Sequence, residues 1–345
     1  MKKLLFVICL FLLLKQNVWA QDPHFSQFFA SPLSLSPAFT GKFDGDVRLT
    51  GNYRDQWPTI NNAFKTTTAA VDFHVLKNKI PYNDIFGVGV MAYNDNSAGG
   101  AVNFNYFTAS AAYHKGLDED GFHQLGVGMQ VTYANAWINT AELKFADQLT
   151  VNGFTNPTND ILGLNGAKLK CNYVDVNAGV LYSGSTNENN NFYFGVSLYH
   201  INKPTQMFDQ QKADSVLFKL NPRATIHAGG YFPISYDNNI TLHLSGIQTF
   251  QNGAQETVLG GALQFAIGKT EETQGISFYA GSWVRLNDAI IPYVGLEYNN
   301  FRFGASYDIN TSSLKAASQG MGGVEVSLVY IYRHSENKPV PCPKF

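Results

Sequence analysis

The chain has 345 residues, a formal net charge of −2 and 14% charged residues, against about 25% in an average soluble domain. This weakly acidic balance gives no support to nucleic-acid binding, which favours clustered basic residues. Aromatic residues also make up 14% of the chain and there are 31 glycines, but no apolar run reaches the roughly 20 residues of a transmembrane helix. Apolar residues are spread thinly along the chain, which is typical of a membrane β-barrel.

Residues 1–20 are typical of a cleaved secretory signal peptide. Lys2 and Lys3 form a positive n-region, residues 4–14 are apolar, and the segment ends at the small residue Ala20. A short apolar run between a basic start and a small cleavage residue is how signal peptides are recognised. We therefore expect cleavage before Gln21 and export of the mature chain to the outer membrane as an integral protein.

From residue 47 onward, apolar and polar residues alternate strictly, which is the period of a β-strand with two different faces. Val71, Phe73 and Val75, for example, alternate with polar Asp72 and His74. Most such segments have about nine to thirteen residues, which suits a tilted strand that crosses a bilayer. We predict an all-β, antiparallel, up-and-down transmembrane β-barrel of about fourteen strands, centred near residues 50, 70, 89, 107, 129, 177, 196, 227, 245, 261, 280, 294, 305 and 328.

The lengths of the connections indicate the orientation of this barrel. The three longest, about residues 137–170, 202–220 and 311–322, follow the fifth, seventh and thirteenth predicted strands and so emerge at one end. The connections at the other end, such as 116–121 and 235–239, are short. Long outer loops and short periplasmic turns are the usual asymmetry of these barrels. We expect both chain ends in the periplasm, with residues 46–333 forming the barrel and residues 334–345 a periplasmic tail.

Residues 21–45 precede the first predicted strand and are too apolar for a free periplasmic tail. Prolines at three positions prevent a continuous helix or strand. We predict a partial plug that packs into or under the periplasmic mouth, and a binding strip for a periplasmic partner remains the alternative. The apolar residues are Phe25, Phe28, Phe29, Leu33, Leu35 and Phe39, and the prolines are Pro23, Pro32 and Pro37.

Charged residues of both signs are expected to face the lumen. Closure of the barrel sets the first strand beside the last, so Arg48 or Arg54 could meet Glu325. Mixed signs in one cavity indicate an ion-pair network that braces the wall, whereas a selectivity ring has a single sign. The predicted network consists of Arg48, Arg54, Asp72, Arg223, Arg285, Glu297, Arg302, Asp308 and Glu325.

The longest predicted outer loop is unusually apolar for an exposed segment, and exposed apolar patches often mark interaction sites. We predict that it forms a surface for a protein partner; the alternative is that the loop folds inward and packs on itself. Its candidate partner-binding residues are Trp137, Ile138, Leu143, Phe145, Ile161 and Leu162.

Catalytic and metal-binding patterns are weak. The chain has no nucleophile elbow of the G-x-S-x-G type. His227 and His243 would face the lumen on adjacent strands, but a zinc site needs three or four ligands and no further ligand is evident. We expect no enzymatic activity, no cofactor and no metal. Cys171 and Cys342 could pair in an exported chain, which a count of two cysteines does not decide.

Motifs at the two ends of the mature chain resemble the PorP/SprF family of Bacteroidetes outer-membrane proteins. Residues 52–58 read NYRDQWP, residues 143–148 read LKFADQ, and residues 338–343 read KPVPCP, all similar to stretches of the family. Ser36 stands where the family usually has Asn. The matching amino-terminal residues include Gln21, Asp22, Pro23, Phe25, Ser26, Gln27, Pro37, Ala38 and Gly41.

This resemblance, closest to SprF-like members, implies a part in the type IX secretion and gliding apparatus. Family members help to secrete a large surface adhesin that carries a C-terminal type IX secretion domain, or hold it at the outer face, and one works in the core secretion machinery. The expected partners are therefore such an adhesin, other type IX components and outer-membrane lipid. A diffusion channel or small-molecule transporter is the alternative function.

Overall fold

The computed structural model describes residues 22, 24–60, 63–77, 79–159, 168–187, 189–208, 216–268 and 275–334. The predicted signal peptide and nearly all of the predicted tail lie outside these residues, as do Gln21, Pro23, Ile161, Leu162 and Cys342. Within the described part of the chain, no helix has the length and apolarity needed to cross a membrane.

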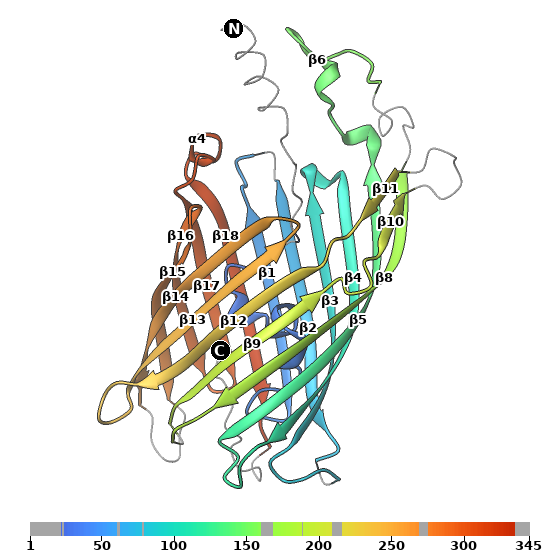
Figure 1. Cartoon of the computed structure of the whole chain (residues 1–345). Helices are drawn as coiled ribbons and strands as arrows, with labels where there is room; N and C mark the ends of the chain where they lie inside the picture. The colour runs from blue at the N-terminus through green and yellow to red at the C-terminus, as the bar shows by residue number, and fades with distance from the viewer. Residues whose placement is uncertain are drawn as a thin grey trace, which may run out of the picture.

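The described strands form one closed antiparallel barrel of 14 strands (Figure 1), which confirms the predicted fold class. Each strand pairs with its neighbours in chain order, and the first pairs with the last. The barrel strands are β1 (Val47–Gln56), β2 (Phe64–Val75), β3 (Ile85–Ser97), β4 (Val102–Gly116), β5 (His123–Asn139), β8 (Lys168–Gly184), β9 (Asn191–Tyr199), β12 (Arg223–Pro233), β13 (Ile240–Gln251), β14 (Ala254–Ile267), β15 (Ile276–Arg285), β16 (Ala289–Tyr298), β17 (Phe301–Asn310) and β18 (Met321–Tyr332).

The barrel wall carries apolar side chains on its outer face and polar side chains on its inner face, the reverse of a soluble protein. Apolar side chains such as Val90, Phe107 and Val131 point outward and are exposed, whereas polar neighbours such as Thr108 and Gln130 are buried inside. Closure satisfies every strand edge with hydrogen bonds, which a membrane-spanning sheet requires. The local alternation in the sequence therefore determines which side chains meet lipid and which meet the lumen.

Connections of very different length leave the two rims. Residues 140–159, 200–208, 218–222 and 311–320 all lie at one rim, shown at the top of Figure 1, which we call the long-loop rim. Short elements within these connections and the neighbouring ones are η3 (Ala98–Gly100), η4 (Thr140–Glu142), η5 (Ala146–Gln148), β6 (Leu149–Thr150), β7 (Gly153–Phe154), β10 (Thr205–Phe208), β11 (Val216–Lys219) and α4 (Lys315–Ser318).

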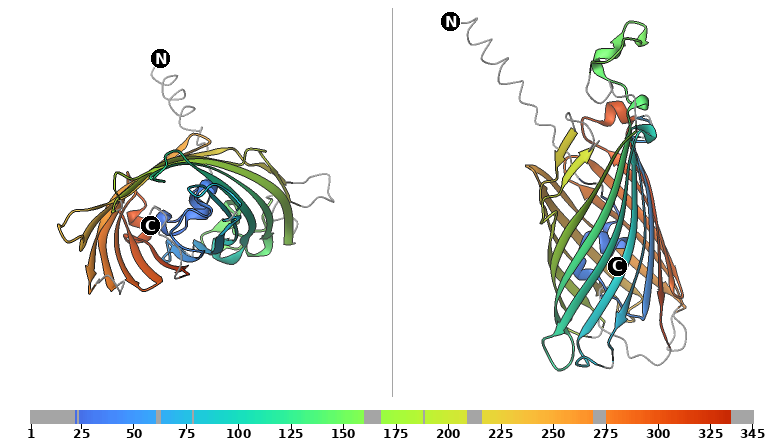
Figure 2. Two further views of the ribbon diagram at one scale, coloured as in Figure 1. Left: turned by 90° about the horizontal axis from the view of Figure 1, so that it is seen from below. Right: turned by 90° about the vertical axis from the view of Figure 1, so that its right-hand side faces the viewer.

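The amino-terminal residues lie inside the ring of strands, as Figure 2 shows in the view along the barrel. We call residues 22 and 24–43 the lumenal segment. It contains three short helices, η1 (Phe28–Ala30), α2 (Pro32–Leu35) and η2 (Pro37–Phe39).

Candidate functional site: the occupied lumen

The lumenal segment extends through the barrel from one rim to the other. At the long-loop rim, Asp22 contacts His200 and Arg223, which flank the connection between β9 and β12. At the opposite rim, the Lys42 ammonium donates to the side-chain oxygen of Gln124, near the start of β5. The lumenal segment therefore contacts the barrel at both rims, and not only at the rim with the short connections.

Prolines and a serine determine the local shape of this segment. Pro32 and Pro37 stand at the first positions of α2 and η2, where the missing amide hydrogen is not needed for helical hydrogen bonding. Ser36 precedes Pro37, and its hydroxyl accepts from the amide of Ala38. The chain thus turns repeatedly inside the barrel, with Phe28, Leu35 and Phe39 in an apolar cluster against the barrel wall.

Glycines in the wall make room for this close packing. A Cβ added to Gly128 on β5 would lie 2.4 Å from the carbonyl carbon of Pro37. A Cβ added to Gly87 on β3 would lie 2.5 Å from the Cα of Gly41, which itself has a φ of +71°. Backbone meets backbone at both places, so even one methyl group forces the segment or the strand to move.

Buried charges bind the middle of the segment to the last strands. The carboxylate of Glu325 on β18 accepts from the backbone amides of Ser26, at 2.7 Å, and Gln27, at 2.8 Å. The Ser26 hydroxyl donates to Asp308 at 2.8 Å and accepts from Arg285 at 2.6 Å. Segment and wall therefore share one hydrogen-bonded network.

Two arginines neutralise the acids of this network. Arg54 lies 2.9 Å from Asp308 and 3.9 Å from Glu325, and Arg285 lies 3.0 Å from Asp308 and 3.4 Å from Glu256. Arg54 also donates to the carbonyl of His24. Buried ions are stable only when they are paired and hydrogen-bonded, and this network provides both.

A second ion pair holds the far end of the segment. Arg48 makes two hydrogen bonds to Asp72, at 2.9 and 2.7 Å, and also donates to the carbonyl of Phe39 at 2.9 Å. Asp72 in turn accepts from the amide of Gly41 at 2.8 Å. The pair between β1 and β2 thereby fixes the last turn of the segment.

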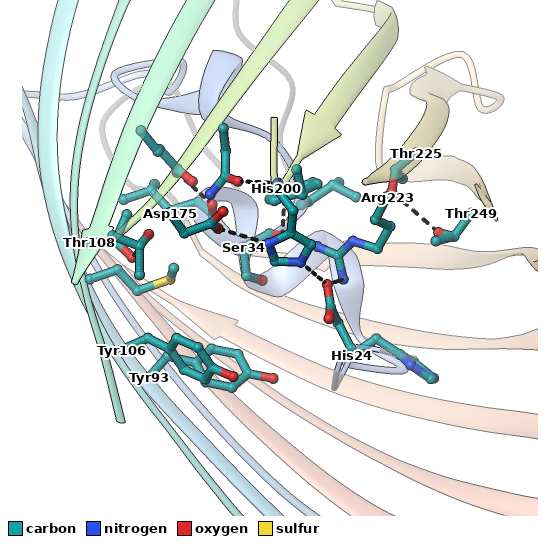
Figure 3. Close-up of a pocket in the computed structure, with 18 of the residues that line it drawn as sticks. His24, Ser34, Tyr93, Tyr106, Thr108, Asp175, His200, Arg223, Thr225 and Thr249 are labelled. Carbon is teal, nitrogen blue, oxygen red and sulfur yellow. Dashed lines mark hydrogen bonds and ion pairs between the residues drawn. The ribbon is translucent and has the colours of Figure 1, made fainter. Parts of the chain in front are cut away.

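A third cluster stands at the long-loop rim (Figure 3). The carboxylate of Asp22 lies 2.7 Å from His200 and 3.3 Å from Arg223, and the other ring nitrogen of His200 lies 3.0 Å from Asp175. Burial opposes the charging of His200, but its hydrogen bonds to Asp175 and Asp22 outweigh burial and raise its pKa to about 9. His200 is therefore a cation at neutral pH.

The predicted charged residues fall into two groups. Seven of them bond to the lumenal segment directly or through one further side chain, whereas Glu297 and Arg302 pair with each other at 2.6 Å elsewhere in the wall. Sequence reasoning did not single out His24, Asp175, His200 and Glu256. Asp175 and Glu256 lie on strands whose alternation could have placed them inside, but His200 follows the end of β9 and had no such signal.

The four candidate partner-binding residues that the structure describes, Trp137, Ile138, Leu143 and Phe145, are buried or half-buried. Ile138 is buried, and Leu143 packs against the same apolar cluster, which includes Phe208 of β10. Trp137 lies on β5 beneath the Lys168 ammonium, 3.7 Å from the ring centre, and Phe145 is half-buried. The exposed apolar side chains are on the β6–β7 hairpin instead: Leu149 at 60%, Val151 at 101% and Phe154 at 46% exposure.

The two lumenal histidines do not meet at a common site. The His227 ring packs against Phe39, with ring centres 5.2 Å apart, and His243 contacts the side-chain amide oxygen of Gln264 at 2.9 Å. No group of three or more metal-ligating side chains occurs among the described residues. Cys171 is buried with a free thiol, and its possible partner Cys342 lies outside the described part of the chain.

Solved structures that resemble this barrel are distant in sequence. A monoaromatic hydrocarbon channel, CymD, is 9% identical, with a TM-score of 0.48 over 88% of this chain and 93% of that chain. A Pseudomonas aeruginosa FadL homologue is 9% identical, with a TM-score of 0.44 over 86% of this chain and 92% of that one. BamA from Haemophilus ducreyi lacking POTRA domains 1–3 is 10% identical, with a TM-score of 0.44 over 83% and 70%.

No curated protein matches the chain. The family model described as type IX secretion system membrane protein PorP/SprF matches residues 17–330, which include the lumenal segment and nearly the whole barrel. The chain therefore belongs to the PorP/SprF family of type IX secretion system membrane proteins.

Proposed function

We propose that this barrel helps to secrete a large adhesin, or holds it at the outer face of the outer membrane, while the lumenal segment keeps its lumen closed. The family and the fold are those of a secretion membrane protein of the outer membrane. An adhesin with a C-terminal type IX secretion domain is the proposed cargo, and other components of the system are proposed neighbours. The signal peptide delivers the chain to that membrane.

The observation that carries the proposal is the buried network around Ser26 and Gln27. A diffusion channel needs a continuous wet path, but here Phe25, Phe28 and Leu33 are at most 4% exposed inside the barrel. Withdrawing the segment would leave Glu325, Asp308 and Arg285 without the partners that it supplies. Loss of one partner from a buried ionic network costs about 3–5 kcal/mol, so the closed form is strongly favoured.

The long-loop rim supplies the proposed contact surface. Its connections extend beyond the barrel (Figure 1), and the β6–β7 hairpin exposes the apolar side chains of Leu149, Val151 and Phe154. Rigid walls with projecting loops are the usual arrangement for binding a partner. The proposed orientation places this rim outside the cell. In this orientation the lumenal segment begins at the outer rim, at Asp22, whereas the lengths of the connections predict an amino-terminal end in the periplasm.

Conductance in planar lipid bilayers separates this proposal from the diffusion-channel alternative. The full mature chain is expected to give little sustained current, whereas a variant that lacks residues 22–41 should open a pore. A matched control that lacks residues 150–157 of the outer loop keeps the segment and should stay closed. Sustained current through the full mature chain would support the channel alternative and contradict the proposal.

A further inference from the structure

A cavity of about 140 Å³ lies between the lumenal segment and the barrel wall, near the long-loop rim (Figure 3). Phe25, Phe28 and Leu33 of the segment form one side of it, and Met91 of β3 and Ile247 of β13 lie on the wall side. A second cavity in the lumen, beside Phe29 and Trp283, measures only about 30 Å³, so of the two it is the space near the long-loop rim that has room for a ligand.

The size of the cavity matches one six-membered ring. An engineered cavity of about 150 Å³ in another protein, lined by apolar side chains, stays dry and binds benzene. Sites for larger ligands usually measure about 300–1,000 Å³. The space is therefore too small for an oligosaccharide or a lipid chain with its headgroup.

Aromatic edges line the cavity. Phe25 and Tyr93 meet edge-on, with ring centres 5.9 Å apart at 65°, and Tyr93 meets Tyr106 at 5.6 Å and 80°. Figure 3 shows Tyr93 and Tyr106 reaching inward together from the wall. Aromatic rings pack favourably in such edge-to-face arrangements, and a further ring can join them in the same way.

Several polar groups around the cavity bond to one another, but the Tyr93 hydroxyl is buried without a hydrogen-bond partner among the described residues. The hydroxyls of Thr108 and Thr132 are 2.8 Å apart, and the Gln130 amide donates to the carbonyl of Leu33 at 2.8 Å. The Tyr199 hydroxyl donates to the carbonyl of Ser34 at 2.9 Å. A ligand need not supply hydrogen bonds to these bonded groups, and the Tyr93 hydroxyl can accept one from, or donate one to, a neutral ring that carries a polar substituent.

The charges at the edge of the cavity also balance. Asp22 and Asp175 face the cations His200 and Arg223, within 3.3 Å of their partners, and His24 is paired with Glu256 at 2.9 Å. A charged ligand would enter without a free counter-charge and would lose its hydration. The occupant should therefore be neutral.

We propose that this cavity binds one neutral aromatic ring, supplied either by a free small molecule or by the side chain of a peptide. Leu220, His200 and Arg223 line it at the long-loop rim, so the ring enters from that side. The proposal does not depend on the role in adhesin secretion.

Methyl NMR of the full mature chain in detergent micelles, with methionine methyl groups labelled, tests this directly. Met91 lines the cavity, whereas Met129 points into the micelle with 57% exposure and reports ring partitioning into detergent. Toluene and p-cresol are expected to shift the Met91 signal to saturation while the Met129 signal moves linearly. A Met91 signal that never saturates with any ring would overturn the proposal, as would saturation by benzoate, which is charged.

A second probe, N-acetyl-phenylalaninamide, distinguishes a free small molecule from a peptide side chain as the source of the ring. Saturation of Met91 by toluene alone indicates a free small molecule, and saturation by both indicates a peptide side chain; either result supports the site. Ile247→Trp should fill the cavity and reduce toluene affinity at least tenfold, whereas Leu244→Trp on the outer face of the same strand should not. Unchanged toluene saturation in a folded Ile247→Trp variant would contradict the assignment to this cavity.

Discussion

Arg54 on β1 and Glu325 on β18 lie opposite each other at the seam where the barrel closes, with 3.9 Å between the Arg54 Nε and a Glu325 carboxylate oxygen. Each side chain is only 1% exposed. The same carboxylate accepts the amides of Ser26 and Gln27. One buried group therefore stabilises both the closure of the barrel and the position of the lumenal segment.

Replacing this carboxylate with an amide should loosen the segment. In Glu325→Gln the side chain keeps its size but has one acceptor oxygen where the carboxylate has two, and Arg54 loses a counter-charge. Breaking a buried pair of this kind costs about 3–5 kcal/mol. We expect a lower unfolding midpoint in heated detergent gels and brief channel openings in planar bilayers. Glu119→Gln on an exposed turn is the control, and an unchanged midpoint for Glu325→Gln would count against the network.

A single methyl group at Gly128 should displace the segment from the wall. The new Cβ of Gly128→Ala would stand 2.4 Å from Pro37, whereas that of Gly51→Ala would have its nearest neighbour at 3.9 Å. Overpacking of a tight contact costs about 1–3 kcal/mol. We expect chymotrypsin to cleave the segment near Phe28 or Phe39 on the order of tenfold faster in Gly128→Ala than in Gly51→Ala, as followed by mass spectrometry. Equal rates would show that the contact adapts without cost.

Stability should decrease at alkaline pH because of His200. Its pKa of about 9 in the folded protein is higher than the ordinary value of 6.5. The folded state therefore binds the proton more tightly, and this contribution is complete below pH 6.5 and is lost as the pH rises through about 9. The unfolding midpoint in detergent should decrease between pH 6.5 and 9, and His200→Gln should flatten this part of the profile. The same slope in both proteins would exclude His200 as its cause.

The exposed hairpin should matter for the adhesin and not for the barrel. Replacing Leu149, Val151 and Phe154 with serine removes exposed apolar surface from the hairpin. Surface substitutions of this kind usually change stability by less than about 0.5 kcal/mol. We expect the unfolding midpoint to stay the same while antibody labelling of the adhesin on intact cells decreases.

A larger deletion and a matched control variant test that prediction further. Shortening the whole connection over residues 140–165 should have the stronger effect on adhesin display. Substituting Asn152 and Thr155 with serine, in the same hairpin, should have no effect on adhesin display. Normal adhesin labelling in the shortened variant would refute the proposed role of this loop.

The strands and their two faces could be read from the chain alone. Alternation is a local property, and each predicted strand centre falls within an observed barrel strand, because a strand in lipid must place apolar and polar residues on opposite sides. Pairing of the first strand with the last follows from closure, which is why the meeting of Arg54 with Glu325 was foreseeable.

The path of the lumenal segment could not be read in this way. Ser26 meets Glu325 across 299 residues, and Asp22 meets His200 across 178; neither contact follows any periodicity. Such pairs form only when folding has closed the barrel around the segment, since each partner comes from a different part of the wall. Alternation therefore predicts a lumen lined with polar and charged groups, and the packing of a non-periodic segment against that lining is what closes it.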